Sequence, residues 1–283
     1  MIPKVIGPFK KDTAKKTTMK YGFYYDSIFS LPFAKDKRHI RVWLPEDYDF
    51  TIPEKRFPVI YFSDGQNMVN RYLSAFGDWE ADKTVHKIFK KYGKSCIIVG
   101  MDCPKVPSKR AEELCSPYPV IKIDPIKIKE PAADKTLDFF VGELKPLIDS
   151  LFHTIPDREH TGVGGSSLGG LFAFYAAVYK PEVFGFNLCY SPAFFLYDTP
   201  LWMKHLDSFD LRPDKQGKIV LYVGGQEFEH DFIDATKKTY QYLKEKGFDE
   251  SRIRYMHDGT QFHNEKAWAK YLIDGLSFWL KDL

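Results

Sequence analysis

Short apolar runs alternate along the chain with amphipathic stretches, and this alternation predicts an α/β fold. The runs Phe57–Phe62, Cys96–Met101 and Phe184–Tyr190 are bounded by turn-forming residues and are almost entirely apolar. Such runs are typical of strands that are buried on both faces of a parallel sheet. Further strands are predicted at residues 20–30, Arg38–Leu44, Lys218–Val223 and Ile253–His257.

Between the strands, the spacing of the apolar residues changes to that of helices. Pro146 interrupts one of these stretches and is expected to kink the helix there. Strands that alternate with helices indicate a mostly parallel central sheet with helices on both faces, and we expect one domain over residues 1–283. Helices are predicted at Trp79–Lys91, Leu137–Phe152, Phe232–Lys246 and Glu265–Leu280.

Two stretches follow neither pattern and are predicted to be loop excursions, one at residues 102–135 and one at residues 191–216. The second holds a short helix near Leu201–Leu206. Long loops in compact domains are often functional. We expect both loops at the carboxyl edge of the sheet, which is where open α/β sheets bind their ligands.

Charge and apolar content exclude several classes of partner. The net charge of +3 is too small to indicate nucleic acid binding. The lysines between residues 10 and 20 are expected to form a solvated arm. The longest apolar runs fall short of the ~18 residues of a membrane span, and the N-terminus lacks the pattern of a secretory signal. The oligomeric state is left open.

The cysteines Cys96, Cys103, Cys115 and Cys189 fit no zinc-binding spacing. We expect them to be thiols in a reducing compartment, and therefore a cytoplasmic protein. A P-loop, a dinucleotide-binding motif and a metal cluster are all missing from the sequence, so we expect no cofactor and no metal.

The candidate chemistry is carried by Gly165-Ser166-Ser167-Leu168-Gly169, which reads G-x-S-x-G. A β-branched residue and glycines precede it, and a helical run of small and apolar residues follows. This order of strand, sharp turn and helix is that of a nucleophile elbow, in which strain in the turn exposes the central serine. Ser167, with glycines two positions away on both sides, is the candidate nucleophile, rather than Ser166.

A serine hydroxyl needs a base and an orienting acid, which follow it in the order serine, acid, histidine. His263 is the candidate base because it lies in a loop between the last predicted strand and the last predicted helix. We expect structural or surface roles for His205, His230 and His257.

The acid is expected directly after the strand Lys218–Val223, where three carboxylates crowd one loop. We favour Glu227, which is the nearest to the strand end, while Asp231 and Glu229 stay open as alternatives. The acid would hold the imidazole in the right tautomer and stabilise its charged form.

An oxyanion formed at the serine needs two preorganised donors. The first is expected to be the backbone N–H of Leu168. The second is expected at the turn after Phe57–Phe62, where Gly65 would let the backbone present the N–H of Gln66.

The chain resembles the esterase-D-like α/β-hydrolases, and in particular their enterochelin-esterase-like branch. The resemblance implies a serine carboxylic ester hydrolase with an α/β-hydrolase fold, in which Ser167, His263 and Glu227 are nucleophile, base and acid. Two positions depart from the expected pattern: Leu168 stands where Met is common in the family, and Asp64 stands where many α/β-hydrolases have His before the oxyanion glycine. The similarity rests on Arg41–Pro45, Pro58–Asn67, Arg110, Glu113, Ser116-Pro117, Leu144–Pro146, Gly165–Gly170, Pro181–Phe184, Ser191-Pro192, Gly259, His263 and Trp268.

The resemblance implies a small-molecule ester as the substrate, because related enzymes cleave siderophore lactones, feruloyl or acetyl esters, or S-formylglutathione. A carboxylesterase is the first hypothesis, and a siderophore trilactone esterase is the second. A third hypothesis, from another class, is a non-catalytic binding protein that keeps the fold. Trp79, Phe194 and Phe195 are candidate walls of an apolar pocket.

Overall fold

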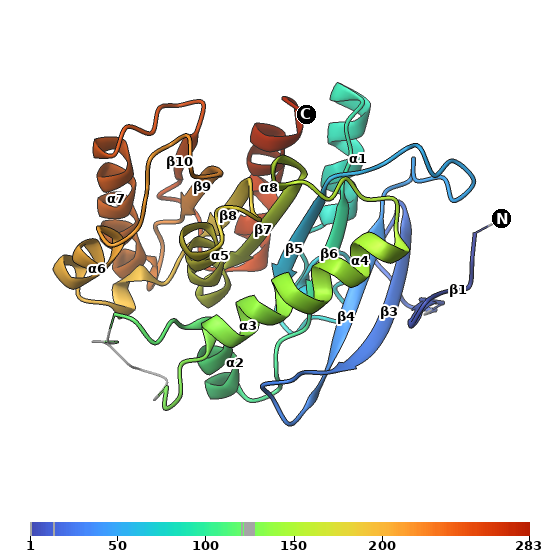
Figure 1. Ribbon diagram of the computed structural model, residues 1–283, viewed down its shortest axis with the longest axis horizontal. Helices are drawn as coiled ribbons and strands as arrows, with labels where there is room; N and C mark the ends of the chain where they lie inside the picture. The colour runs from blue at the N-terminus through green and yellow to red at the C-terminus, as the bar shows by residue number, and fades with distance from the viewer. Residues whose placement is uncertain (1, 14, 120, 122–127) are drawn as a thin grey trace. The chain divides into compact units, whose positions relative to one another are not determined.

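The structure is a computed structural model that describes residues 2–13, 15–119, 121 and 128–283 (Figure 1). The chain divides into two compact units. The first comprises Met1–Cys103, Phe139–Thr161 and Asn264–Leu283, and the second comprises Pro104–Asp138 and Gly162–His263.

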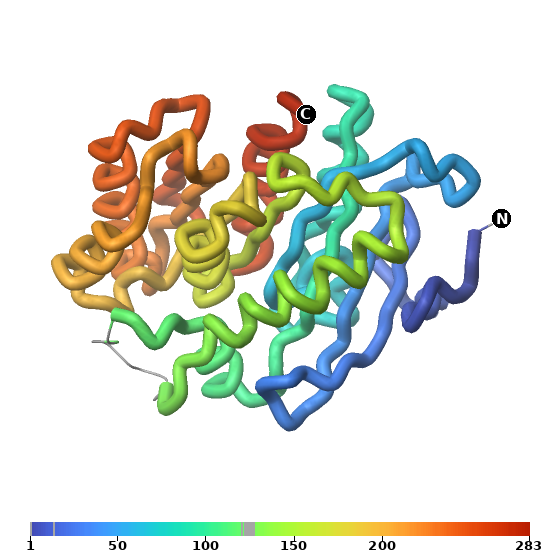
Figure 2. Tube along the Cα trace, in the orientation of Figure 1, coloured from blue at the N-terminus to red at the C-terminus, as the bar shows by residue number. Residues whose placement is uncertain are grey.

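The first unit holds strands in the order β1-β2-β3-β4-β6-β5. Its antiparallel hairpin of β3 (Phe23–Ser30) and β4 (Lys37–Leu44) can be followed as two blue segments in Figure 2. Strand β4 runs antiparallel to β6 (Ile97–Met101), and β6 runs parallel to β5 (Val59–Ser63). Every residue of β5 and β6 is buried, as their continuous apolar runs predict.

The lysine-rich N-terminal segment is not simply a solvated arm, so this expectation is wrong in part. Strand β1 (Val5–Ile6) pairs with β2 (Phe9–Lys11), which in turn pairs with β3. Phe9 is fully buried, and its ring contacts those of Phe29 and Phe152. Burial of this one aromatic ring therefore fixes a strand whose neighbouring residues are lysines.

The helix expected at Leu137–Phe152 consists of three segments, and its interruption at Pro146 is confirmed. α3 (Ala133–Phe139) is followed by the π-helical segment η2 (Phe140–Leu144) and by α4 (Lys145–Leu151). Proline lacks an N–H and its ring clashes with the carbonyl four residues earlier in an α-helix. The wider π turn before Pro146 accommodates both defects without ending the helix.

Two long helices of the first unit match the predictions closely. α1 spans Ala81–Tyr92, and α8 spans Glu265–Leu280. The two helices contact each other. Asn264 caps α8, since its side chain accepts a hydrogen bond from the backbone N–H of Ala267.

The second unit has the parallel strand order β7-β8-β9-β10, seen in Figure 1. Its helices α5 (Leu168–Tyr179) and α7 (Glu229–Glu245) pack on β8 and β9 respectively. The prediction of an α/β fold is confirmed. In the first unit β5 and β6 pair in parallel and β1–β4 are antiparallel, and in the second unit β7–β10 pair in parallel. The strands span Thr161–Ser166, Phe186–Tyr190, Lys218–Val223 and Ile253–His257.

The two predicted loop excursions contain more structure than expected. Residues 102–135 include α2 (Pro107–Leu114), which begins at a proline with a preset φ, and the first residues of α3. Residues 120 and 122–127 of this stretch lie outside the described residues. Residues 191–216 include η4 (Phe194–Leu196) and the predicted short helix, α6 (Thr199–Leu206).

Within the described ranges, no helix combines the length and the apolar character needed to cross a membrane. All four cysteines are present as thiols, as expected.

Candidate active site

The G-x-S-x-G segment forms a sharp turn between β7 and α5, both in the second unit. Ser167 lies at the turn with φ 59° and ψ −120°, a conformation that L-residues rarely adopt. Its backbone N–H donates to the carbonyl oxygen of Tyr190 at 2.9 Å, and its own carbonyl accepts from Leu171 at 3.0 Å. These bonds hold the strained residue between the end of β8 and the first turn of the helix.

The glycine at position 170 allows the helix to approach the sheet. A Cβ atom there would lie 2.6 Å from the carbonyl oxygen of Tyr190, which is closer than real Cβ atoms come. Ser167 is partly exposed, whereas Ser166 is buried in β7. The backbone therefore presents Ser167, and not Ser166, as the accessible hydroxyl.

Leu168 is the first residue of α5, so its backbone N–H belongs to the helix end that lacks internal acceptors. The partial positive charge of a helix N-terminus favours negative charge at this point. The role of Leu168 as an oxyanion donor is consistent with this position and stays a prediction.

His263 follows β10 in the loop that leads to α8, and its imidazole contacts a buried carboxylate. The Nδ1 atom of His263 lies 3.2 Å from Oε1 of Glu229. The Glu229 side chain is 0% exposed and that of His263 is 9% exposed. A carboxylate in contact with Nδ1 favours the tautomer that carries its proton there.

The carboxylate beside His263 is therefore that of Glu229, and the preference for Glu227 is corrected. Glu227 is exposed and has a φ of 54°, and Asp231 is exposed as well. The error lies in the helix boundary: α7 begins at Glu229, not at Phe232. Glu229 thus occupies the buried face of the helix, which it shares with residues three, seven and ten positions later, Phe232, Thr236 and Thr239.

The carboxylate of Glu229 is held by a second residue, Ser191, at the end of β8. The Ser191 hydroxyl donates to Oε1 of Glu229 at 2.6 Å, and Ser191 is itself 0% exposed. Gly224 leaves room for this carboxylate, since a Cβ there would lie 3.2 Å from Oε1. Glu229 thus connects the ends of β8 and β10 through its partners.

Aromatic rings surround His263. The ring centroids of Phe232 and Phe228 lie 4.6 Å and 4.9 Å from that of the imidazole. Phe232 is buried, whereas 54% of Phe228 is exposed. Phe195, a predicted pocket residue, is partly exposed and packs edge-on against Phe232 at 4.6 Å. An apolar surface therefore adjoins the histidine.

The other two predicted pocket residues lie in the core, and this corrects their assignment as pocket walls. Trp79 is 2% exposed and packs against Phe62 and Trp268. Phe194 is also 2% exposed, and its ring contacts those of Phe174 and Trp202. Burial against other rings accounts for both residues without a ligand.

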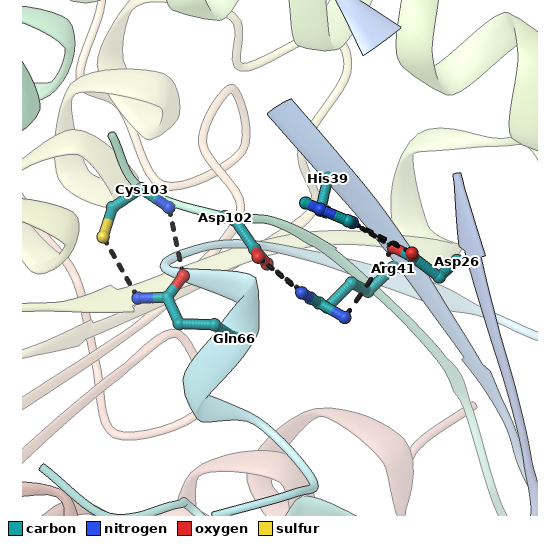
Figure 3. Close-up of polar contacts among 6 residues, drawn as sticks. All are labelled: Asp26, His39, Arg41, Gln66, Asp102 and Cys103. Atoms are coloured by element: carbon teal, nitrogen blue, oxygen red, sulfur yellow. Dashed lines mark hydrogen bonds and ion pairs between the residues drawn. The ribbon is translucent and has the colours of Figure 1, made fainter. Parts of the chain in front are cut away.

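Gln66 belongs to the turn η1 (Gly65–Asn67) of the first unit, and its side chain holds this turn against the segment after β6. The amide Nε2 donates to Sγ of Cys103 at 3.2 Å, and Oε1 accepts from the backbone N–H of Cys103 at 3.0 Å (Figure 3). Gly65 packs closely against Gly100: a Cβ atom on Gly65 would lie 2.5 Å from the carbonyl carbon of Gly100. The turn is therefore tightly fixed, and the role of Gln66 as a second oxyanion donor stays a prediction.

An ion-pair network begins at the residue next to Cys103. Asp102 accepts two hydrogen bonds of 2.6 Å from Arg41, which also lies 3.7 Å from Asp26 (Figure 3). Asp26 is in turn 2.9 Å from Nδ1 of His39. The network therefore links β3, β4 and the end of β6.

The remaining histidines named as candidates have other environments. The Nε2 atom of His205 lies 2.9 Å from the Tyr179 hydroxyl, and burial lowers the pKa of this imidazole. His230 and His257 are exposed. Among the residues that the structure describes, no group of His, Cys, Asp or Glu side chains is arranged to hold a metal ion.

The sequence does not indicate Ser191, Phe228 or Phe232 as site residues. Ser191 belongs to a Ser-Pro pair after a strand, and nothing in that pair indicates a buried hydroxyl. The helical pattern predicts a helix at Phe232, but the contact of this ring with His263 depends on how α7 and the distant loop of His263 pack together.

Comparison with known proteins gives consistent matches along most of the chain. The model of the family described as "Putative esterase" matches residues 33–279. The uncharacterized protein YbbA of Bacillus subtilis (strain 168) is 24% identical over 263 residues, which cover 86% of this chain and 92% of that protein.

Solved structures give the same picture. A ferulic acid esterase superposes with a TM-score of 0.68 at 17% identity and covers 95% of this chain and 100% of its own. The siderophore hydrolase EstB from Aspergillus nidulans gives a TM-score of 0.68 at 18% identity, with 96% and 98% covered. These likenesses show that the fold is that of the α/β-hydrolases.

Proposed function

Because the chain belongs to the esterase family, whose members hydrolyse carboxylic esters, we propose that it cleaves its ester with a triad of Ser167, His263 and Glu229. The observation that carries this proposal is the contact between His263 and the fully buried Glu229, in the same unit as the strained turn at Ser167. A buried carboxylate against an imidazole, together with a serine in a nucleophile elbow, is the arrangement that serine hydrolases need.

In this mechanism, Oγ of Ser167 attacks the carbonyl carbon of the ester while Nε2 of His263 takes its proton. Nδ1 faces the carboxylate of Glu229, whose negative charge stabilises the imidazolium. The oxyanion of the tetrahedral intermediate receives a hydrogen bond from the backbone N–H of Leu168, at the N-terminus of α5.

The intermediate collapses when the C–O bond to the alcohol breaks, and His263 gives its proton to the leaving oxygen. This leaves an acyl group on Ser167. A water molecule then attacks the acyl carbon, His263 takes one of its protons, and the acid is released as Ser167 regains its hydrogen. No cofactor enters these steps.

The surface beside the histidine supports a proposal for the substrate class. An exposed Phe228 ring next to His263 favours an ester with an aromatic group near its carbonyl. Hydroxycinnamoyl esters are the first candidates. Siderophore trilactones are the second, because one structural relative is a siderophore hydrolase.

The proposed nucleophile is tested by comparing Ser167→Ala with its matched control, Ser166→Ala. We expect Ser167→Ala to lower kcat for a chromogenic ester by about 10⁴-fold or more, and Ser166→Ala to keep most of the activity. A fluorophosphonate probe should phosphonylate the parent and Ser166→Ala, but not Ser167→Ala. An unlabelled parent would instead indicate a binding protein without catalysis.

A further inference from the structure

We propose that Ser191 is a positioning residue that holds the Glu229 carboxylate in the orientation in which it contacts His263. This inference rests on the proposed function, since it assigns a role to a residue that acts through the triad acid. It is carried by the hydroxyl of Ser191, which no step of the mechanism uses.

The geometry places both partners on one carboxylate oxygen. Oε1 of Glu229 accepts the Ser191 hydroxyl at 2.6 Å and lies 3.2 Å from Nδ1 of His263. Within the described part of the chain, the buried Oε2 atom of Glu229 has no hydrogen-bond partner. The hydroxyl of Ser191 is therefore the neutral donor that selects which oxygen faces the imidazole.

The burial of this group makes the hydrogen bond important. Ser191 and Glu229 are both 0% exposed, so water does not replace the hydroxyl at this point of the structure. A hydrogen bond to an ionised group is stronger than one between neutral groups, and a buried carboxylate depends on such donors. The position of Glu229 in the first turn of α7 adds a favourable helix dipole.

The backbone at Ser191 supports a role for its side chain. Its φ of 40° lies in the left-handed region, where glycine is the residue of lowest strain. Its N–H donates to the carbonyl oxygen of Tyr222 at 2.6 Å, which ties the end of β8 to β9. Glycine would adopt this backbone conformation with less strain. The serine side chain offsets that strain by donating a hydrogen bond to Glu229, which glycine could not do.

The test uses two substitutions that both remove the hydroxyl but differ in backbone strain. Ser191→Ala keeps the strain of the positive φ, and Ser191→Gly relieves it. We expect both to lower kcat for a chromogenic ester roughly ten- to a hundredfold with KM changed by less than about twofold. Thr236→Val is the matched control, because Thr236 is buried on the same face of α7 as Glu229. This control should keep the parental kcat.

A double-mutant cycle with Glu229→Gln separates positioning from general packing. Once the carboxylate is gone, there is no charge to orient, so adding Ser191→Ala to Glu229→Gln should lower kcat by less than about threefold. A structural role would instead give multiplicative losses.

Two results would overturn the inference. One is a kcat of Ser191→Gly equal to that of the parent. The other is a double variant whose loss in kcat equals the product of the losses of Ser191→Ala and Glu229→Gln. If Glu229→Gln itself retains the parental kcat, the triad proposed for this protein fails first, and the role of Ser191 fails with it. If Ser191→Ala does not fold, Ser191→Gly decides, because its backbone strain is lower than that of the parent.

Discussion

Each unit contains at least one histidine in contact with a carboxylate, and the contacts of His39 and His263 differ in kind. In the first unit, Nδ1 of His39 lies 2.9 Å from Asp26, with side chains that are 42% and 30% exposed. In the second unit, Nδ1 of His263 lies 3.2 Å from Glu229, with side chains that are 9% and 0% exposed. The shorter contact is thus the more exposed one, and distance alone does not single out the pair that we propose for catalysis.

The neighbours of the two carboxylates explain the difference. Asp26 forms an ion pair with Arg41, which also donates two hydrogen bonds to Asp102 (Figure 3). Glu229 is in contact with an imidazole and a neutral hydroxyl. Exposed ion pairs contribute little to stability, whereas a buried carboxylate facing one imidazole is an arrangement that active sites use. The two histidines therefore differ in how deeply their carboxylate partners are buried and in which other groups those carboxylates contact.

The largest effect that tests this comparison is expected from neutralising each carboxylate in turn. Glu229→Gln should lower kcat by about 10³- to 10⁴-fold, because the imidazole loses its counter-charge and an amide NH2 facing Nδ1 would favour the wrong tautomer. Asp26→Asn and Glu227→Gln should each stay within about twofold of the parent. Steady-state kinetics on one chromogenic ester measures all three variants.

Two results would contradict the distinction between the pairs. Loss of activity in Asp26→Asn equal to that in Glu229→Gln would mean that the exposed pair also serves the reaction. A large loss of kcat in Glu227→Gln, together with parental kcat in Glu229→Gln, would mean that Glu227 is the acid, as its position next to the strand end predicts.

Glu229 shows where sequence reasoning about the site stops. The elbow at Ser167 and the loop of His263 are local features, and motif and order along the chain indicate both. The choice among three carboxylates depends on where α7 begins, and helix boundaries are the least certain part of a prediction. The inward face shared by Glu229 and Phe232 becomes visible only once that boundary is known.

The fold shows the same division between local and distant information. Apolar runs and Pro146 are read directly from the sequence, so β5, β6 and the interrupted helix are predicted. The burial of Trp79 depends on Trp268, which is far away along the chain, and a single tryptophan in a sequence does not reveal such a partner. Strand β2 likewise depends on the contacts of Phe9 with Phe29 and Phe152.

The next effect concerns the stability of the network in the first unit. The Arg41 and Asp102 side chains are 10% and 15% exposed, so Arg41→Met leaves a largely buried carboxylate without its counter-charge. We expect the free energy of unfolding to fall by about 3 kcal/mol, measured by urea denaturation. Asp102→Asn should cost about half as much, because Arg41 still faces Asp26 at 3.7 Å.

The pH dependence of these variants sharpens the test. Burial raises the pKa of Asp102 above its ordinary value, while the hydrogen bonds from Arg41 act against this rise. A carboxyl with a raised folded-state pKa stabilises the fold when protonated, and this contribution is lost as the pH increases through that pKa. Removing Arg41 raises the pKa further, so the stability deficit of Arg41→Met should widen between about pH 4 and pH 7. An equal deficit at both pH values would mean that the carboxylate is not desolvated.

The smallest effect is expected from the aromatic surface that adjoins His263. Phe228→Ala removes an exposed ring 4.9 Å from the imidazole, and an aromatic contact of this kind contributes about 1 kcal/mol. We therefore expect kcat/KM for a feruloyl ester to fall about fivefold, while kcat/KM for an acetyl ester of the same alcohol stays unchanged. Phe228→Leu is the matched control, because it keeps an apolar side chain but not the ring. Equal losses on both esters would mean that Phe228 supports His263 rather than the substrate, and the preference for aromatic esters would then have no basis in this surface.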